Sequence, residues 1–187
     1  LSRIMRFYRW TYWLVAIALS SAIKFPAQGV QAPDGTVSFE AGLLLKDAYT
    51  TFRGVRVRQA RYYFDLELPN DIGESLQKVV IQQRSGGDEV KFEPEETEVY
   101  LGNHRDKAER VQAIATTDEA KEKITVQLEQ PIPPGSSVTI GLKPQSNPDY
   151  GGVYLFGVTA YPTGEKARGM YLGAGRLHFD NNSDDHF

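Results

Sequence analysis

The sequence predicts an all-β fold, an antiparallel β-sandwich of the immunoglobulin-like kind with at most short helical segments. Three observations predict it. Period-two alternation of apolar and polar residues recurs along the chain, clusters of Gly, Pro, Asn, Asp and Ser interrupt it roughly every eight to fifteen residues, and no long amphipathic helical pattern occurs. Many short strands of this kind favour a sandwich, and a partly closed barrel is the alternative.

The composition is that of one domain with a packed core. The chain has 187 residues, of which 41% are hydrophobic, and it contains no Cys, which excludes disulfides, thiolate metal sites and a cysteine nucleophile. Four of the 21 basic residues and none of the 24 acidic residues lie within residues 1–32, so the remainder has a net charge of −7. This acidic remainder disfavours nucleic-acid binding.

Residues 1–32 have the pattern of a secretory signal peptide with a signal helix. Three arginines within the first nine residues precede an apolar run over residues 10–23, and small residues suited to cleavage follow. A membrane-spanning helix needs about 20 apolar residues, which is longer than this run. We therefore expect export to a periplasm, a thylakoid lumen or the extracellular space, with membrane contact only through this segment if it stays uncleaved.

Residues 33–179 form a single predicted sandwich domain. In its first half, residues 55–69 indicate a long strand or a bent pair, in which Phe64, Leu66 and Leu68 face one way. The only helical pieces that the pattern favours are short, at 43–50 and 118–123. Further short apolar runs indicate strands at 77–84, 90–92, 97–101 and 111–115.

The second half of the domain alternates most regularly. Residues 123–129 and 137–143 indicate two strands separated by a Pro-rich turn. Residues 152–161 are apolar on both faces, which is typical of a central strand, and residues 170–179 indicate the last strand.

Residues for nucleophilic catalysis are scarce, and we predict no catalytic residue. The only histidines are His104, His178 and His186, and no Gly-x-Ser-x-Gly motif occurs. No helix follows Gly173 and Gly175, so they indicate a strand bulge or close strand packing rather than a phosphate loop. Paired Asp and Glu residues could still form a glycosidase site, because only their separation in space decides it.

The acidic C-terminal end, residues 180–187, is predicted to be a flexible tail. Asp180, Asn182 and Asp184 place oxygen ligands at alternate positions, as at the start of a calcium-binding loop. The Gly that such a loop needs at its sixth position is Asp185 here, and no Glu closes the loop. A flexible tail is the favoured interpretation, a calcium site is the alternative, and no cofactor is predicted.

Four arginines lie within nine residues at the start of the region predicted as a strand: Arg53, Arg56, Arg58 and Arg61. In a strand, Arg56 and Arg58 would share one face. The simpler interpretation is a solvated face. The more specific one is a docking stripe for an acidic protein or a polysaccharide, whose binding would weaken with salt.

Several motifs follow one another along the chain: Tyr62-Tyr63-Phe64, then residues 73–81, 133–142, 147–162 and 172–179. Their order resembles that of a secreted cyanobacterial family known as domain of unknown function 2808. The resemblance extends from about Gly35 to Phe179, implies an exported cyanobacterial protein and supplies no catalytic residues. Within its motifs, six residues stand out without a known role: Asn147, Pro148, Gly151, Gly152, Arg176 and His178.

Taken together, these patterns predict an exported, non-catalytic β-sandwich module that binds a protein or glycan partner in the cell envelope or lumen. The alternatives are a carbohydrate-active hydrolase that uses Asp or Glu, and a calcium-binding accessory protein that uses the acidic tail. Neither nucleic acid nor a cofactor is an expected partner.

Overall fold

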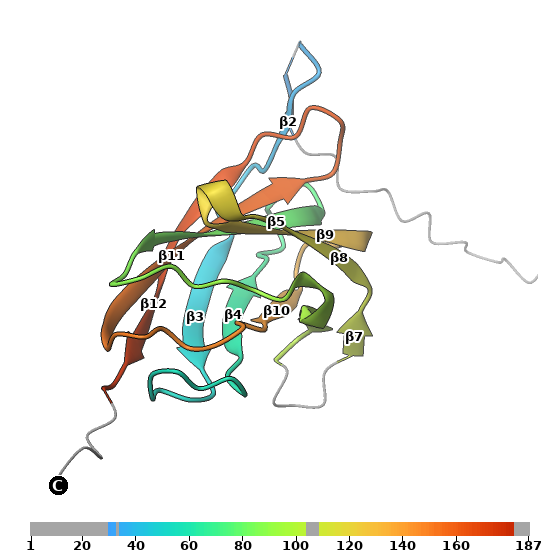
Figure 1. Cartoon of the computed structure of the whole chain (residues 1–187). Coiled ribbons are helices and arrows are strands. Elements are labelled where there is room, and N and C mark those ends of the chain that lie inside the picture. Colours follow the sequence, from blue (N-terminus) through green and yellow to red (C-terminus); the bar gives the residue numbers. More distant parts are fainter. Residues whose placement is uncertain (1–29, 33, 104–108, 182–187) are drawn as a thin grey trace, which may run out of the picture.

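The computed structural model describes residues 30–32, 34–103 and 109–181 (Figure 1). The predicted signal helix falls on residues that lie outside the described ones, as do His104 and residues 182–187 of the predicted tail. In the described part of the chain, no helix is long and apolar enough to cross a membrane.

Within the described residues, the strands form two five-stranded antiparallel sheets and a two-stranded ribbon (Figure 1). The β4 sheet has the order β3-β4-β10-β6-β7, with β3 Leu44–Thr50, β4 Tyr62–Glu67, β10 Ser137–Leu142, β6 Glu98–Leu101 and β7 Glu109–Val111. The β11 sheet has the order β12-β11-β5-β9-β8, with β12 Met170–Phe179, β11 Gly152–Pro162, β5 Leu76–Ser85, β9 Lys123–Ile132 and β8 Ala113–Asp118. The ribbon pairs β1 Val30–Gln31 with β2 Val37–Ser38, and the short 3₁₀ turns are η1 Pro94–Glu96 and η3 Glu119–Lys121.

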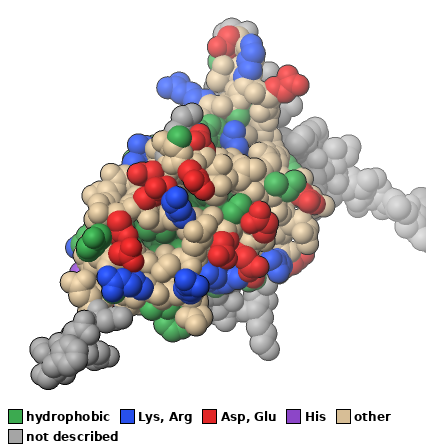
Figure 2. Space-filling model, viewed as in Figure 1, with side chains coloured by type: hydrophobic (Ala, Val, Ile, Leu, Met, Phe, Trp, Pro, Cys, Tyr) green, Lys and Arg blue, Asp and Glu red, His purple; other side chains and the backbone are tan. Residues whose placement is uncertain are grey.

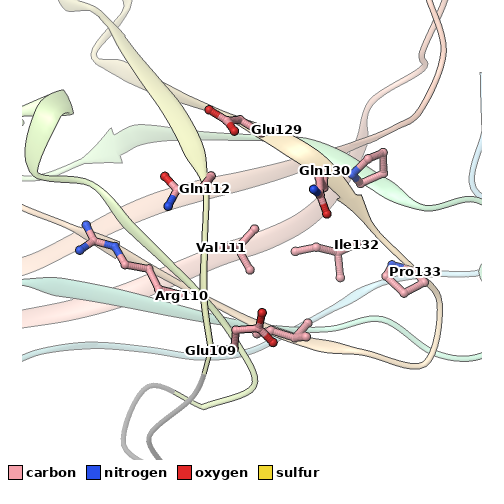
Figure 3. Close-up of a pocket in the computed structure, with 10 residues that line it drawn as sticks. Glu109, Arg110, Val111, Gln112, Glu129, Gln130, Ile132 and Pro133 are labelled. Atoms are coloured by element: carbon pink, nitrogen blue, oxygen red, sulfur yellow. The ribbon is translucent and has the colours of Figure 1, made fainter.

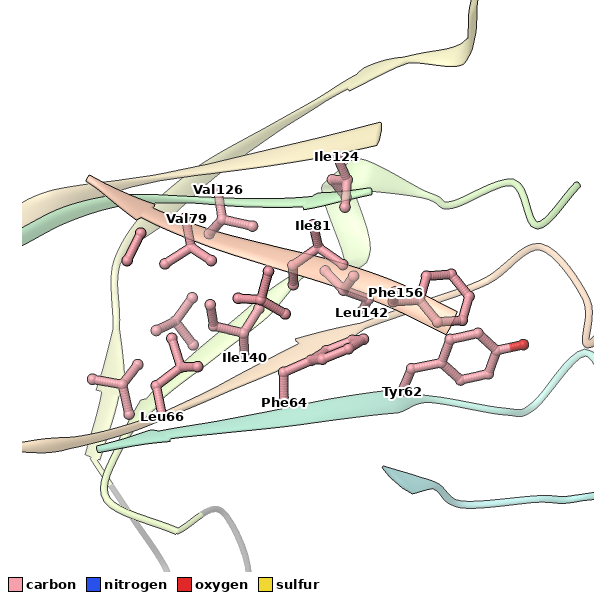
Figure 4. Close-up of a cluster of buried hydrophobic side chains, with 14 of the residues drawn as sticks. Tyr62, Phe64, Leu66, Val79, Ile81, Ile124, Val126, Ile140, Leu142 and Phe156 are labelled. Carbon is pink, nitrogen blue, oxygen red and sulfur yellow. The ribbon is translucent and has the colours of Figure 1, made fainter. Parts of the chain in front are cut away.

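Alternate residues of the facing strands fill the space between the two sheets (Figure 4). Tyr62, Phe64 and Leu66 point inward from β4 and are almost completely buried, as is Phe156 from β11. The rings of Phe64 and Phe156 meet edge to face, with 6.1 Å between their centroids. Burial of such aromatic and aliphatic side chains is the main source of stability. The predicted antiparallel sandwich is confirmed.

The outer strands β3 and β12 meet along one side of the sandwich and close it. A Cβ atom at Gly175 of β12 would lie 2.6 Å from the Cβ atom of Ala48 in β3, so only glycine permits this approach. Gly173 has a φ of +115° and lies beside a register shift between β11 and β12. These two glycines show both features that the sequence predicted, a bulge and close strand packing.

Residues 43–50, predicted as a short helix, form β3 instead. Ala48 and Tyr49 pair with Phe64 and Tyr63 of β4, and the two tyrosine rings stack at 5.4 Å between centroids. Helical preference amounts to only about a few tenths of a kcal/mol per residue, which strand pairing and burial outweigh. The other short helical piece, predicted at 118–123, is confirmed as η3.

The strand predicted over residues 55–69 is wrong in its first half, because β4 begins only at Tyr62. The backbone of residues 51–61 turns repeatedly, and Arg56 has a φ of 58°. Its partners are loop segments instead of a strand: Val55 N–H donates to the carbonyl oxygen of Asp180 at 3.1 Å, and Arg56 N–H donates to that of Pro148 at 3.1 Å. Arg56 and Arg58 therefore do not share a strand face.

Candidate functional site

Four segments gather at the end of the sandwich where β3, β10 and β12 finish (Figure 1). We call this surface the loop end, and its segments are residues 51–61, 86–90, 144–151 and 180–181. At the opposite end, the β1–β2 ribbon joins the segment 163–169 through backbone hydrogen bonds. Because connecting loops often carry function on a rigid scaffold, the loop end is the first place to search for a site.

Asn147 fixes the 51–61 loop to the neighbouring 144–151 segment. Its side chain is only 2% exposed. Its amide nitrogen donates to the carbonyl oxygens of Phe52 at 2.9 Å and Gly54 at 2.7 Å, and its amide oxygen accepts a hydrogen bond from Tyr62 Oη at 3.0 Å. The Asn147 backbone N–H also donates to the Val57 carbonyl oxygen at 2.9 Å. A buried amide with its donors and acceptor satisfied holds a loop in one conformation.

A second buried network supports the same end from the side of β5. The Tyr154 hydroxyl donates to Asp88 Oδ1, and Asp88 Oδ2 accepts a hydrogen bond from Asp149 N–H at 2.9 Å. Gln83 Nε2 donates to the Asp88 carbonyl oxygen at 2.7 Å. Burial and the bond to Asp88 raise the pKa of Tyr154 to about 12. Burial also raises the pKa of Tyr62 well above its ordinary value of 10.0, so both phenols remain donors at neutral pH.

The start of the predicted tail is bound to this end. Asp180 N–H donates to the Arg53 carbonyl oxygen at 2.7 Å, and Asp180 forms a parallel bridge with Gly54. The Asn181 side-chain oxygen accepts a hydrogen bond from Gly151 N–H at 2.8 Å. Asn182 and Asp184, the other residues of the predicted calcium site, lie outside the described residues.

The predicted arginine stripe separates into different environments. Arg53 pairs with Asp180 at 3.5 Å and Arg56 with Asp149 at 3.2 Å, and all four of these side chains are more than half exposed. Such exposed ion pairs contribute about 0–1 kcal/mol. Figure 2 shows basic side chains beside acidic ones along the lower edge of the viewed face, where Figure 1 places the 51–61 loop.

The other two arginines of the stripe differ from each other. Arg61 is only 22% exposed and pairs with Glu96 at 3.2 Å and Glu98 at 3.5 Å, so it stabilises the β4 sheet. The exposed side chain of Arg58 makes no ion pair with another described residue, while its carbonyl oxygen accepts a hydrogen bond from Lys143 Nζ at 2.6 Å. Arg58 is therefore the member of the stripe that is most open to a partner.

Two large apolar side chains are exposed at the loop end, Phe52 at 48% and Tyr150 at 63%. The sequence analysis singled out neither residue as a binding residue. The available signal was an aromatic residue inside a turn-rich polar segment, where no strand face could bury it.

The six motif residues divide into two groups. Asn147 and Pro148 are buried, and a Cβ atom at Gly151 would lie 2.6 Å from Asn181 Oδ1, so this group builds the loop end. Gly152 begins β11 with a φ of +143°. The second group lies on β12: Arg176 is exposed, and His178 Nε2 lies 3.1 Å from Asp180 Oδ1.

A hollow with a volume of about 320 Å³ lies between β7 and the end of β9 (Figure 3). Glu109 and Glu129 lie at its opposite ends, with Val111 and Ile132 pointing toward each other between them. Its described lining contains no aromatic residue of the kind that a sugar-cleaving site uses. The described residues also contain no group of three His, Cys, Asp or Glu that could hold a metal ion.

Solved structures with a similar fold include bacterial surface proteins. The collagen-binding domain of a Staphylococcus aureus adhesin is 12% identical, with a TM-score of 0.36 over 70% of this chain and 96% of that one. The collagen-binding subdomain of the Enterococcus faecalis surface protein ACE is 8% identical, with a TM-score of 0.42 over 72% and 94%. The C-terminal domain of the Streptococcus pyogenes antigen I/II-family protein AspA is 10% identical, with a TM-score of 0.42 over 71% and 46%. Similarity at this level carries no conclusion about partners.

The family relationship rests on sequence. No curated protein matches the chain. The sequence profile of a family described as "Protein of unknown function (DUF2808)" matches residues 36–179, which covers both sheets and most of the loop end. The chain therefore belongs to this family, as its motifs predicted, and the family's function is not known.

Proposed function

We propose that this chain is an exported, non-catalytic β-sandwich module whose loop end binds a protein partner with an acidic surface. The observation that carries the proposal is the buried Asn147, which fixes the 51–61 loop while Phe52, Tyr150 and Arg58 remain exposed. Residues 1–32 support export through their basic start and apolar run. The cyanobacterial source stays a prediction of the resemblance.

The exposed side chains are of the types that dominate protein interfaces. Aromatic residues and Arg are enriched among the residues whose truncation costs an interface most. Because the Asn147 network already orders the loop, binding would not have to order it, and less affinity is lost to conformational entropy. The loop end thus combines a fixed backbone with aromatic and cationic contacts.

The charge of the 51–61 loop favours an acidic partner. Arg58 has no acid paired with it among the described residues, and the exposed pairs of Arg53 and Arg56 can exchange their acids for a partner's at little cost. The chain beyond residue 32 has a net charge of −7 even with this loop included, so its other surfaces would repel such a partner. Electrostatic attraction would therefore also select the orientation of docking.

The test compares proteins retained from an envelope and exported-protein extract by the full chain and by two double variants. Phe52→Ala with Tyr150→Ala changes the loop end, while the matched control, Leu44→Ala with Ile114→Ala, removes exposed apolar side chains elsewhere. The purified partner is then titrated calorimetrically against each. We expect the loop-end variant alone to bind the partner about tenfold or more weakly than the unchanged chain does. High salt should weaken binding by every form.

Either of two results would contradict the proposal. One is the absence of any specifically retained protein at low salt. The other is a partner that binds the loop-end variant as tightly as it binds the unchanged chain.

A further inference from the structure

A groove lies beside the loop end, on the side of the sandwich where β3 and β12 meet. It has a volume of about 280 Å³ and is open to solvent. Residues from both sheets line it: Ala48, Tyr49, Thr50, Arg53, Arg176, Leu177 and His178. It is separate from the exposed pair Phe52 and Tyr150, neither of which lines it.

The groove results from how the two outer strands approach each other. β3 is hydrogen-bonded only to β4 and β12 only to β11, so no ladder joins them. They touch where Gly175 lies against Ala48. Toward the loop end, β12 carries the larger side chains of Arg176 and His178, which form one wall. The loop that follows β3 thus brings Arg53, an arginine of the predicted stripe, beside Arg176 and His178 of β12, two motif residues without a role.

The charge of this groove is positive on an otherwise acidic domain. The described lining contains no Asp or Glu. Asp180 lies close to two of the lining side chains, 3.5 Å from Arg53 Nε and 3.1 Å from His178 Nε2. The side chain of Arg176 makes no hydrogen bond or ion pair with any described residue, so its guanidinium is available to a ligand.

We propose that this groove binds the carboxylate group of an acidic sugar, with Arg176 as its principal contact and Arg53 and His178 beside it. A guanidinium offers two parallel N–H donors that match a planar carboxylate. His178 supplies a polar group for sugar hydroxyls, and Tyr49, which lines the groove and is only partly buried, supplies an aromatic surface for ring carbons. The volume lies near the lower end of ligand pockets, about 300–1,000 Å³, which suits a short glycan segment.

This inference goes beyond the proposed function, because it does not require a protein to bind the loop end. The two sites also fail separately. Phe52→Ala with Tyr150→Ala should leave sugar binding unchanged, and Arg176→Gln should remove sugar binding whether or not a protein partner exists.

The experiment titrates the full chain with trigalacturonate and with its fully methyl-esterified form, which has the same sugar but no charge. Calorimetry measures affinity, and NMR amide shifts locate the contact. We expect binding of the acid only, with the largest shifts at Ala48, Thr50 and Leu177. Arg176→Gln should weaken binding by about tenfold or more, whereas Arg168→Gln, the same charge change at an exposed position near the opposite end, should weaken it less than about twofold.

Any of the following binding results would overturn the proposal. If the methyl ester binds as tightly as the free acid, the groove does not recognise the carboxylate. Equal loss in Arg176→Gln and Arg168→Gln would show only general attraction to charge. Hexaglutamate or inorganic sulfate binding as tightly as trigalacturonate would replace the sugar with an acidic peptide or a simple anion. An unchanged thermal unfolding midpoint in both variants excludes misfolding as the cause, since both arginines are exposed.

Discussion

The two ends of the sandwich are held in different ways. At the loop end, the buried side chains of Asn147, Gln83 and Tyr154 bind the backbone of other segments or an acid from one of them. At the opposite end, the β1–β2 ribbon is attached through the backbone of Val37, which accepts from Arg168 N–H at 2.8 Å and donates to the Lys166 carbonyl oxygen at 3.0 Å. Val37 itself is only partly buried.

The two kinds of attachment, buried side-chain bonds and backbone bonds near solvent, should give loops of similar length different rigidity. A buried side chain that loses its partners leaves unsatisfied polar groups in the interior, so its loop opens only when the domain unfolds. A ribbon held by backbone bonds near solvent can open alone, because water replaces the lost bonds. The proposed binding surface lies on the end that cannot open alone.

The largest loss of stability is expected from Asn147→Leu, because Asn147 is the buried side chain that distinguishes the loop end from the ribbon end. Removing the amide leaves the carbonyl oxygens of Phe52 and Gly54 and the Tyr62 hydroxyl without this partner. We expect a loss of about 2–4 kcal/mol in the free energy of unfolding, measured by urea denaturation. Asn147→Asp, which keeps the shape but not the two donors, should also destabilise. A loss below about 1 kcal/mol would mean that the buried amide holds the loop end no more firmly than backbone bonds hold the ribbon.

A smaller loss, about 1–2 kcal/mol, is expected for Tyr154→Phe. This change keeps the ring in the core and removes the hydrogen bonds to Asp88 and to the Tyr150 carbonyl oxygen. Tyr150→Phe is the matched control, since its exposed hydroxyl makes no described hydrogen bond and its loss should be under about 0.5 kcal/mol. Equal losses in the two variants would show that the Asp88 network does not stabilise the loop end.

The same tyrosine predicts how stability responds to alkaline pH. The folded pKa of Tyr154, about 12, is higher than its ordinary value of 10.0, so folding favours the neutral phenol. Its contribution is complete below pH 10 and is lost as pH rises from about 10 toward 12. Urea midpoints measured across this range should therefore fall less steeply for Tyr154→Phe. A steeper fall in the variant would mean that folding lowers the pKa of Tyr154 instead of raising it.

The smallest change in global stability, under about 1 kcal/mol, is expected for Val37→Ala in the ribbon. Hydrogen exchange then sharpens the comparison between the two ends. The amides of Val37 and Asn147 both donate to a carbonyl oxygen, at 3.0 and 2.9 Å, yet Val37 should exchange at least about a hundredfold faster. Equal protection of the two amides would mean that the ribbon also opens only with the whole domain.

The regular part of the fold was predictable because alternation and burial agree there. The strand predicted at 170–179 matches β12 at both ends, and Phe64, Leu66 and Leu68, predicted to face one way, are all buried. The larger errors fall in 43–61, where a weak helical preference yields to pairing with β4 and where an alternating Val-Arg pattern belongs to a loop. The strand predicted at 90–92 is only an isolated bridge at Phe92, and the one predicted at 111–115 is divided between β7 and β8 of different sheets.

The candidate sites were predictable only in part, because their partners are distant in sequence. The motif drew attention to Asn147, but its bonds join it to Tyr62, Phe52 and Gly54, between 85 and 95 residues away. The groove needs Arg53, from the loop that follows the outer strand β3, and Arg176, from the outer strand β12 of the other sheet. No local pattern predicts that these strands meet, so composition alone could not assemble either site.

The contact between Gly175 and Ala48 also bears on how the protein avoids aggregation. An outer strand with unpaired N–H and C=O groups can accept a strand from another molecule. By lying against each other, β3 and β12 shield the two longest outer edges of the sandwich, while β7 is only three residues long and η1 lies beside β8. One residue without a side chain thus keeps neighbouring copies from adding to the sheets, which matters most where a cysteine-free protein is stable by packing alone.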